Sequence, residues 1–129
     1  MIQAPRFFRI DQDGFTVEAC CMRMGDDYLL SIWGGTPHIG AVAMAQPRDS
    51  LQDPARRSAT ASVFCYVGHK EDQVVKEVSE RMSRELNTKV VVAAGLHWDE
   101  LTPAGAAQVL RSVNVLITEI IQQMLTASK

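Results

Sequence analysis

The sequence predicts one α+β domain over residues 1–129, with two helices packed on a mainly antiparallel sheet of about six strands. Short apolar runs separated by turn residues occupy the first half, and apolar residues at helical spacing occupy two later segments. Strands and helices do not alternate regularly, so repeated strand-helix-strand units with a parallel sheet are not expected. A length of 129 residues suits a single domain.

Five strands are predicted in the first half of the chain, at residues 7–10, 15–24, 28–33, 39–46 and 60–67. The first two are joined by Asp13-Gly14, a pair that favours a tight hairpin turn because glycine adopts positive φ readily. The fourth strand consists mainly of small residues, which would let another group pack closely on it. Residues 47–58 contain Pro47 and Pro54 and show no apolar period, so we expect an exposed loop there.

Two helices and one more strand are predicted in the second half. Apolar residues recur every fourth position from Val74 to Leu86, which predicts a helix over residues 70–86. Residues 90–94 form a short apolar run that is typical of a strand buried on both faces. A last helix is expected to begin at Pro103 and to run to about residue 125.

The last helix is apolar over most of its circumference between Val109 and Met124. One face of a sheet is too narrow to cover so wide an apolar surface. We therefore expect part of this helix to form the subunit interface of a homodimer.

Composition excludes several classes of protein. Fifteen acidic residues against thirteen basic ones leave no surplus positive charge for binding nucleic acid. No apolar stretch reaches the roughly 18 to 20 residues of a membrane span, and Asp11 and Asp13 lie where a signal peptide needs an apolar core. No membrane association and a cytoplasmic location are expected. Three cysteines are too few for a disulfide framework, and an odd number cannot all be paired, so we expect reduced thiols.

The three histidines each lie beside a glycine or proline at the end of a predicted strand. They are His38, His69 and His97. Strand ends present side chains to ligands, and glycine lets a backbone approach a ligand closely, so the sequence predicts one shared binding site. Gly68 and Lys70 flank His69 at the expected start of the first helix, where free N–H groups favour an anion such as a phosphate.

The histidine pattern leaves alternatives open. His38, His69 and His97 could together bind a divalent metal, with Asp99 or Glu100 as a partner of His97 or as a general base. Their separation of about thirty residues lacks the i,i+4 spacing of a strong zinc motif, and each histidine alone also suits a structural role. Neither a nucleophile elbow nor a phosphate-binding loop nor a dinucleotide fingerprint is present, so an enzyme is the less favoured interpretation.

Three motifs resemble those of one family. The runs 34–43 (GGTPHIGAVA), 68–72 (GHKED) and 95–99 (GLHWD) are similar to the LpdD-type accessory proteins of UbiD-type aromatic-acid decarboxylases. The resemblance spans nearly the whole chain. It implies a fold like that of small dimeric proteasome-assembly chaperones, and a chaperone that binds prenylated flavin mononucleotide (FMN) for its partner, the decarboxylase.

The resemblance places the ligand site at Gly34, Gly35, Pro37, His38, His69, Lys70 and His97. Together with the strand-end pattern, the expected cofactor-binding residues are Gly34, Gly35, Pro37, His38, Gly68, His69, Lys70, His97 and Asp99. Trp98 has no assigned place in the family pattern, although its ring could stack on a flat ligand. A non-catalytic flavin chaperone is thus the leading hypothesis. The alternatives are a small metal-dependent enzyme with a three-histidine site and an assembly factor that acts through its last helix.

Overall fold

The computed structural model describes residues 4–127, so residues 1–3 and 128–129 of the predicted domain lie outside it. Six strands and two helices lie within that range. In chain order they are β1 (Arg6–Gln12), β2 (Phe15–Met24), β3 (Asp27–Gly35), β4 (Ala41–Asp49), β5 (Arg57–Cys65), α1 (Asp72–Leu86), β6 (Val90–His97) and α2 (Pro103–Ala127). The α+β class and the mainly antiparallel sheet are confirmed.

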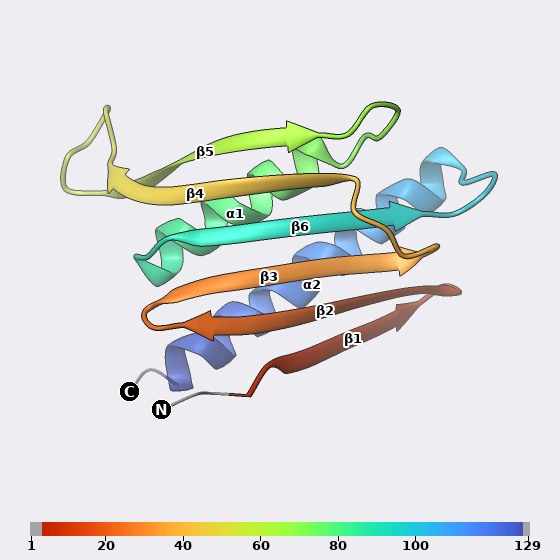
Figure 1. The fold of residues 1–129 in the computed structure, drawn as a ribbon, viewed down its shortest axis with the longest axis horizontal. Coiled ribbons are helices and arrows are strands. Elements are labelled where there is room, and N and C mark those ends of the chain that lie inside the picture. The colour runs from red at the N-terminus through yellow and green to blue at the C-terminus, as the bar shows by residue number, and fades with distance from the viewer. Residues whose placement is uncertain (1–3, 128–129) are drawn as a thin grey trace.

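All six strands form one sheet in the order β1-β2-β3-β6-β4-β5. Every neighbouring pair is antiparallel except β3 and β6, which run parallel from Tyr28 beside Val90 to Gly35 beside His97. The last strand is therefore inserted between two earlier ones. Figure 1 shows the result: the carboxyl ends of β3, β5 and β6 and the start of β4 meet at one end of the sheet.

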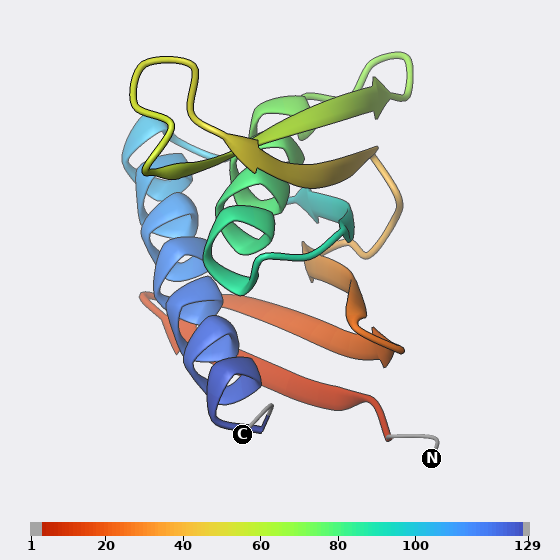
Figure 2. The same ribbon diagram turned by 90° about the vertical axis from the view of Figure 1, so that its left-hand side faces the viewer.

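Both helices lie on the same face of the sheet (Figure 2). α1 packs on β4, β5 and β6, α2 packs on β1 and β2, and the two helices touch each other. The core lies between these layers and includes Leu30, Ile32 and Val92 from the sheet, with Met82 and Ile117 from the helices. Neither helix covers the opposite face, which we call the open face of the sheet; within the described chain, the β3–β4 connection crosses it at the end of β6, over Gly95.

α2 buries much of its apolar surface within the single chain, although Leu110, Val115 and Leu125 stay exposed. It is long and apolar enough to cross a membrane by length and composition, but nine of its residues are buried in this fold. The sheet and α1 together enclose Val109, Leu116 and Ile120, whereas Val115 remains exposed. The sheet and α1 therefore cover part of the surface that was expected at a subunit interface, and an interface on the exposed remainder of α2 stays a prediction.

Three strands, β4, β5 and β6, differ clearly from their predicted extents. β4 and β5 stay paired as far as Asp49 beside Arg57, so the expected loop over residues 47–58 shrinks to residues 50–56. Pro47 is tolerated because β4 pairs with β6 only as far as Ala45, which leaves one side of the strand free at the proline. β6 runs three residues further than expected. Its alternate residues are half-buried on the open face, and not enclosed on both faces as predicted.

Candidate functional site

The three histidines meet at the end of the sheet where β3 and β6 stop. His38 lies in the β3–β4 connection, His69 in the β5–α1 connection and His97 at the last position of β6. The ring centroids of His38 and His69 are 4.9 Å apart, and those of His38 and His97 are 6.4 Å apart. Residues about thirty positions apart in sequence are thus adjacent because β6 is inserted between β3 and β4.

The segment that carries His38 is held on top of β6. The backbone N–H of Thr36 donates to the carbonyl of His97, and the N–H of Gly40 donates to the carbonyl of Ala94 (both 2.9 Å). Gly95 permits this close approach, since a Cβ there would overlap the backbone of His38. His38 itself is only partly exposed, and its Nδ1 lies 2.9 Å from the carbonyl oxygen of Thr36.

The segment that carries His69 turns sharply before α1. Gly68 has a φ of +82°, and the N–H of His69 donates to the carbonyl of Tyr66 (3.1 Å). The Cys65 thiol donates to the carbonyl of His69 (3.2 Å), which further fixes the turn. The side chain of His69 is 37% exposed, so its ring is open to ligand on one side.

The start of α1 differs from the expected phosphate site. The helix begins at Asp72, two residues later than predicted, and Glu71 is its N-cap residue. Two carboxylates thus occupy the positive end of the helix dipole, where an anion was expected. This helix start favours a cation over a phosphate. Lys70 lies just before it and lines a neighbouring cavity.

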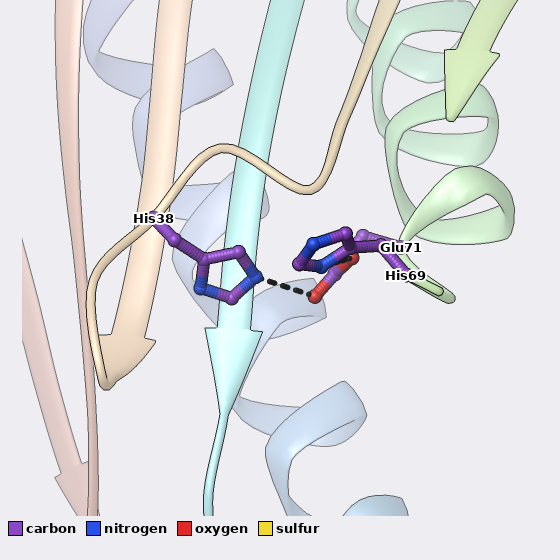
Figure 3. Close-up of side chains that lie close together, drawn as sticks. All are labelled: His38, His69 and Glu71. Carbon is purple, nitrogen blue, oxygen red and sulfur yellow. Dashed lines mark hydrogen bonds and ion pairs between the residues drawn. The ribbon is translucent and has the colours of Figure 1, made fainter. Parts of the chain in front are cut away.

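Glu71 connects the two histidine segments and was missed by the sequence analysis. Its Oε1 lies 3.1 Å from Nε2 of His38, and its Oε2 lies 3.7 Å from Nδ1 of His69 (Figure 3). The residue is only 7% exposed, and Oε2 has no hydrogen-bond partner. Gly40 makes room for the carboxylate, since a Cβ there would overlap it. The spacing of Gly40 and Glu71 gives no sequence signal of this contact.

One ligand atom from each of His38, His69 and Glu71 lies within 4.8 Å of the others. We call these three residues the His-His-Glu cluster. His97 was predicted as the third metal ligand, but it does not belong to this group. Its Nε2 instead lies 3.1 Å from Oδ1 of Asp99, and both of these side chains are well exposed.

A cavity of about 540 Å³ opens beside the cluster, between the starts of both helices and the end of β6. Its polar lining comes from His69, Lys70, Glu71 and His97, together with the backbone at Gly68. Its apolar wall is formed by Val74, Leu96, Trp98, Leu101, Ala106, Val109 and Leu110. Of the predicted cofactor-binding residues, four therefore line one cavity: Gly68, His69, Lys70 and His97.

The remaining predicted residues lie elsewhere. Pro37 and His38 line a shallower hollow of about 370 Å³ on the open face, with Trp33. Gly34 and Gly35 were expected to let a ligand approach closely, but the protein's own chain lies there. Trp98 packs on Gly34, and Gly35, at a φ of +68°, lies against the carbonyl of His97. Trp98 is also held edge-on to Phe15, with ring centroids 5.4 Å apart.

The fold places this chain among small two-layer proteins with an assembly-chaperone architecture. It is similar to a solved structure described as a novel chaperone complex for yeast 20S proteasome assembly, with a TM-score of 0.60 and 12% sequence identity. The likeness covers 98% of each chain and, at this identity, shows the fold alone.

The sequence itself defines the family. Residues 11–125 match the model of the prenylated flavin chaperone LpdD-like domain, and the chain belongs to that family. It is also 26% identical over 115 residues to Protein LpdD of Lactiplantibacillus plantarum (strain ATCC BAA-793 / NCIMB 8826 / WCFS1). That similarity covers 88% of this chain and 81% of the relative. The chain is thus an LpdD-like chaperone-domain protein, as the three motifs indicated.

Proposed function

We propose that this protein is a non-catalytic cytoplasmic chaperone that binds prenylated FMN and supports its delivery to, or maturation on, a UbiD-type decarboxylase. The observation that carries the proposal is the cavity beside the His-His-Glu cluster in a chain of the prenylated flavin chaperone family. The family assignment favours a chaperone over the alternative of a metal-dependent enzyme.

The cavity suits a flat phosphorylated ligand in size and in lining. Its volume of about 540 Å³ lies within the range of roughly 300 to 1,000 Å³ that small-molecule sites have. Trp98 and the leucines give one apolar wall for a ring system, because flat rings gain from stacking and from burial of apolar area. Lys70, which lines the cavity just before the helix start, gives a positive charge for a phosphate.

The test is retention of the cofactor. The protein is mixed anaerobically with reduced prenylated FMN, a second sample is mixed with the oxidised form, and each is desalted before its flavin absorbance is measured. We expect about one flavin per chain from at least one redox state. Retention of neither form would contradict the proposal.

Two cavity variants and one matched control locate the site. Lys70→Ala removes the phosphate partner and Trp98→Ala removes the ring wall, so each is expected to weaken flavin binding by roughly tenfold or more. Lys76→Ala removes the same charge from the exposed side of α1, outside the cavity, and should leave binding unchanged. Transfer is then measured as activity restored to an apo-decarboxylase by the loaded wild-type protein.

A further inference from the structure

We infer that His38, His69 and Glu71 form a binding site for one divalent transition-metal ion. Their ligand atoms lie within 4.8 Å of one another, close enough for a single ion to contact all three. Two imidazoles and one carboxylate are a ligand set that zinc and neighbouring first-row metals accept, whereas calcium and magnesium prefer oxygen ligands alone. The inferred set replaces His97 with a residue that the sequence did not indicate.

The hydrogen bond of His38 fixes which nitrogen faces the cluster. Nδ1 lies 2.9 Å from a backbone carbonyl, which can only accept, so Nδ1 carries a hydrogen and donates it. In the neutral ring, Nε2 then presents a lone pair to Oε1 of Glu71 at 3.1 Å. Two lone pairs at this distance repel each other unless a positive charge lies with them. A histidine that donates one ring N–H to a carbonyl and turns the other nitrogen inward is typical of metal ligands.

The carboxylate of Glu71 also requires a positive partner. Its side chain is 9% exposed, and its Oε2 makes no hydrogen bond although it lies 3.7 Å from Nδ1 of His69. Burial of an unpaired charge is costly, so a site with a bare carboxylate oxygen is stabilised by a cation. The remaining contact, from the N–H of Leu96 to Oε1 at 3.4 Å, is long and leaves Oε2 free.

The backbone around the cluster is built to bring the three side chains together. Gly40 and Gly95 lack the Cβ atoms that would push away Glu71 and the His38 segment, respectively. Gly68, at a φ of +82°, makes the turn just before His69, and Figure 3 shows the side chains of His38, His69 and Glu71 close together. Since three protein ligands leave at least one coordination position open, and His69 and Glu71 line the large cavity, the open position faces a molecule bound there.

An oxygen of the cavity's occupant can complete the coordination. For a phosphorylated flavin this oxygen would belong to the phosphate. The metal ion would then lie between the phosphate and the acidic start of α1. This last step rests on the proposed function. The metal site itself does not, because it depends only on the three side chains and their geometry.

The first experiment measures metal binding directly. Untagged protein is stripped with EDTA, dialysed and titrated with zinc chloride by calorimetry, and with cobalt chloride by visible absorption of the bound ion. We expect one ion per chain. Glu71→Gln keeps the size of the side chain but removes its charge, and His38→Gln removes an imidazole; each should weaken binding by more than about 100-fold, beyond what loss of an outer hydrogen bond causes.

Control variants separate this cluster from the histidines in general. His97→Gln removes a nearby, more exposed imidazole outside the cluster and should bind zinc like the wild type. His69→Gln changes a side chain that is 37% exposed, so the fold is expected to tolerate it, and it should also lose binding. Circular dichroism before each titration identifies any variant that fails to fold.

Three results would overturn the inference: fewer than about 0.1 ions bound per chain at saturating zinc, equal loss in His97→Gln, or normal binding in a folded Glu71→Gln or His69→Gln. Failure here is distinguishable from failure of the proposed function, because the two are measured separately: protein that binds no zinc but still retains flavin would refute the metal site and keep the chaperone.

Discussion

Glycines determine how closely the segments of the site approach one another. Gly40 and Gly95 face different kinds of neighbour: a Cβ on Gly40 would meet the Glu71 carboxylate, whereas one on Gly95 would meet the backbone of His38. A side chain can rotate away, but a backbone held by hydrogen bonds on both sides cannot. A substitution at Gly40 should therefore mainly disturb the site, whereas a substitution at Gly95 should mainly destabilise the fold.

We expect Gly40→Ala to damage the His-His-Glu cluster more than the fold, because the new methyl group displaces the Glu71 carboxylate. Zinc affinity should fall by at least tenfold, while the free energy of unfolding falls by about 1 to 2 kcal/mol. Gly95→Ala is the comparison, and it should destabilise by roughly 2 kcal/mol or more because the His38 segment must lift off β6. Urea denaturation and zinc calorimetry measure the two effects. Equal zinc affinity in Gly40→Ala and wild type would contradict this account.

The two adjacent cysteines face opposite sides of the sheet. Cys20 is half-buried on the open face, whereas Cys21 is buried in the core, and all three cysteines are free thiols. Burial raises the pKa of the Cys21 thiol to about 11, with a smaller contribution from the neighbouring Cys20. Only the thiolate is nucleophilic, so Cys21 is protected both by its pKa and by its position.

Iodoacetamide at pH 8 should therefore alkylate Cys20 well before Cys21, as read by peptide mass spectrometry.

The raised pKa of the Cys21 thiol also predicts that the protein loses stability in alkali. The folded state holds the Cys21 proton more tightly than the unfolded state, whose pKa is near 9.0, so this contribution is complete below pH 9 and is lost as pH rises towards 11. The loss is about 2 to 3 kcal/mol at most. Cys21→Ala should lack this component, and an identical alkaline profile would exclude it.

At the residue scale, the sequence indicated the three histidines and Gly68, but not Gly40, Gly95 or Glu71. Histidine and glycine are informative because they are few and because they lie at strand ends. Glu71 looks like an ordinary acidic residue at a helix start, and its contact with His38 spans 33 positions of sequence. Only the insertion of β6 between β3 and β4 brings the two together, and no local pattern predicts that order.

At the scale of elements, α2 shows how neighbours decide what a helix buries. Its apolar period predicted the helix itself correctly, from Pro103 onward. How much of α2 is covered depends on where α1 packs, and that is a property of the tertiary structure. The ends of strands also depend on their neighbours. The local sequence at Pro47 predicted a loop, but β4 continues through this residue because its partner β5 continues beside it.

The two sides of α2 should respond differently to truncation. Ile120 is fully buried, so Ile120→Ala leaves a cavity and should cost about 2 to 5 kcal/mol of unfolding free energy. Val115 is 58% exposed, and Val115→Ala should change stability by no more than about 0.5 kcal/mol. Urea denaturation at two protein concentrations measures both. A large, concentration-dependent loss in Val115→Ala would instead support the original expectation of a subunit interface on this helix.

At the scale of the whole molecule, the open face of the sheet is an uncovered apolar surface. One row of paired residues crosses all six strands without a charge: Phe7, Cys20, Ser31, Ala93, Val42 and Phe64. Next to it, Met22, Leu29, Val91 and Met44 continue the apolar surface. Phe7, Met44 and Phe64 are each more than 60% exposed. An apolar area that spans a whole sheet is typical of an interaction surface.

A second copy of the chain is the occupant that we expect on this face. Six strands about 4.8 Å apart and about eight residues long give a face of roughly 24 by 26 Å. Two such faces bury on the order of 1,200 Å², the lower limit for a stable interface. Because the face is apolar and its central row carries no charge, it can pair with itself about a two-fold axis, as two sheets do in a sandwich.

Met44→Glu places a charge in the middle of the open face and should convert a homodimer into a monomer, since an unpaired buried charge opposes association. Val115→Glu places the same charge at a similarly exposed site on α2, 58% against 61% exposed, and should leave the dimer intact. Sedimentation equilibrium at tens of micromolar reports the mass, which for the wild type should be twice the 14.3 kDa of one chain. A wild-type mass of one chain would rule out the dimer. Dissociation by Val115→Glu alone would move the interface to α2, so the pair of variants decides between the two surfaces of the molecule.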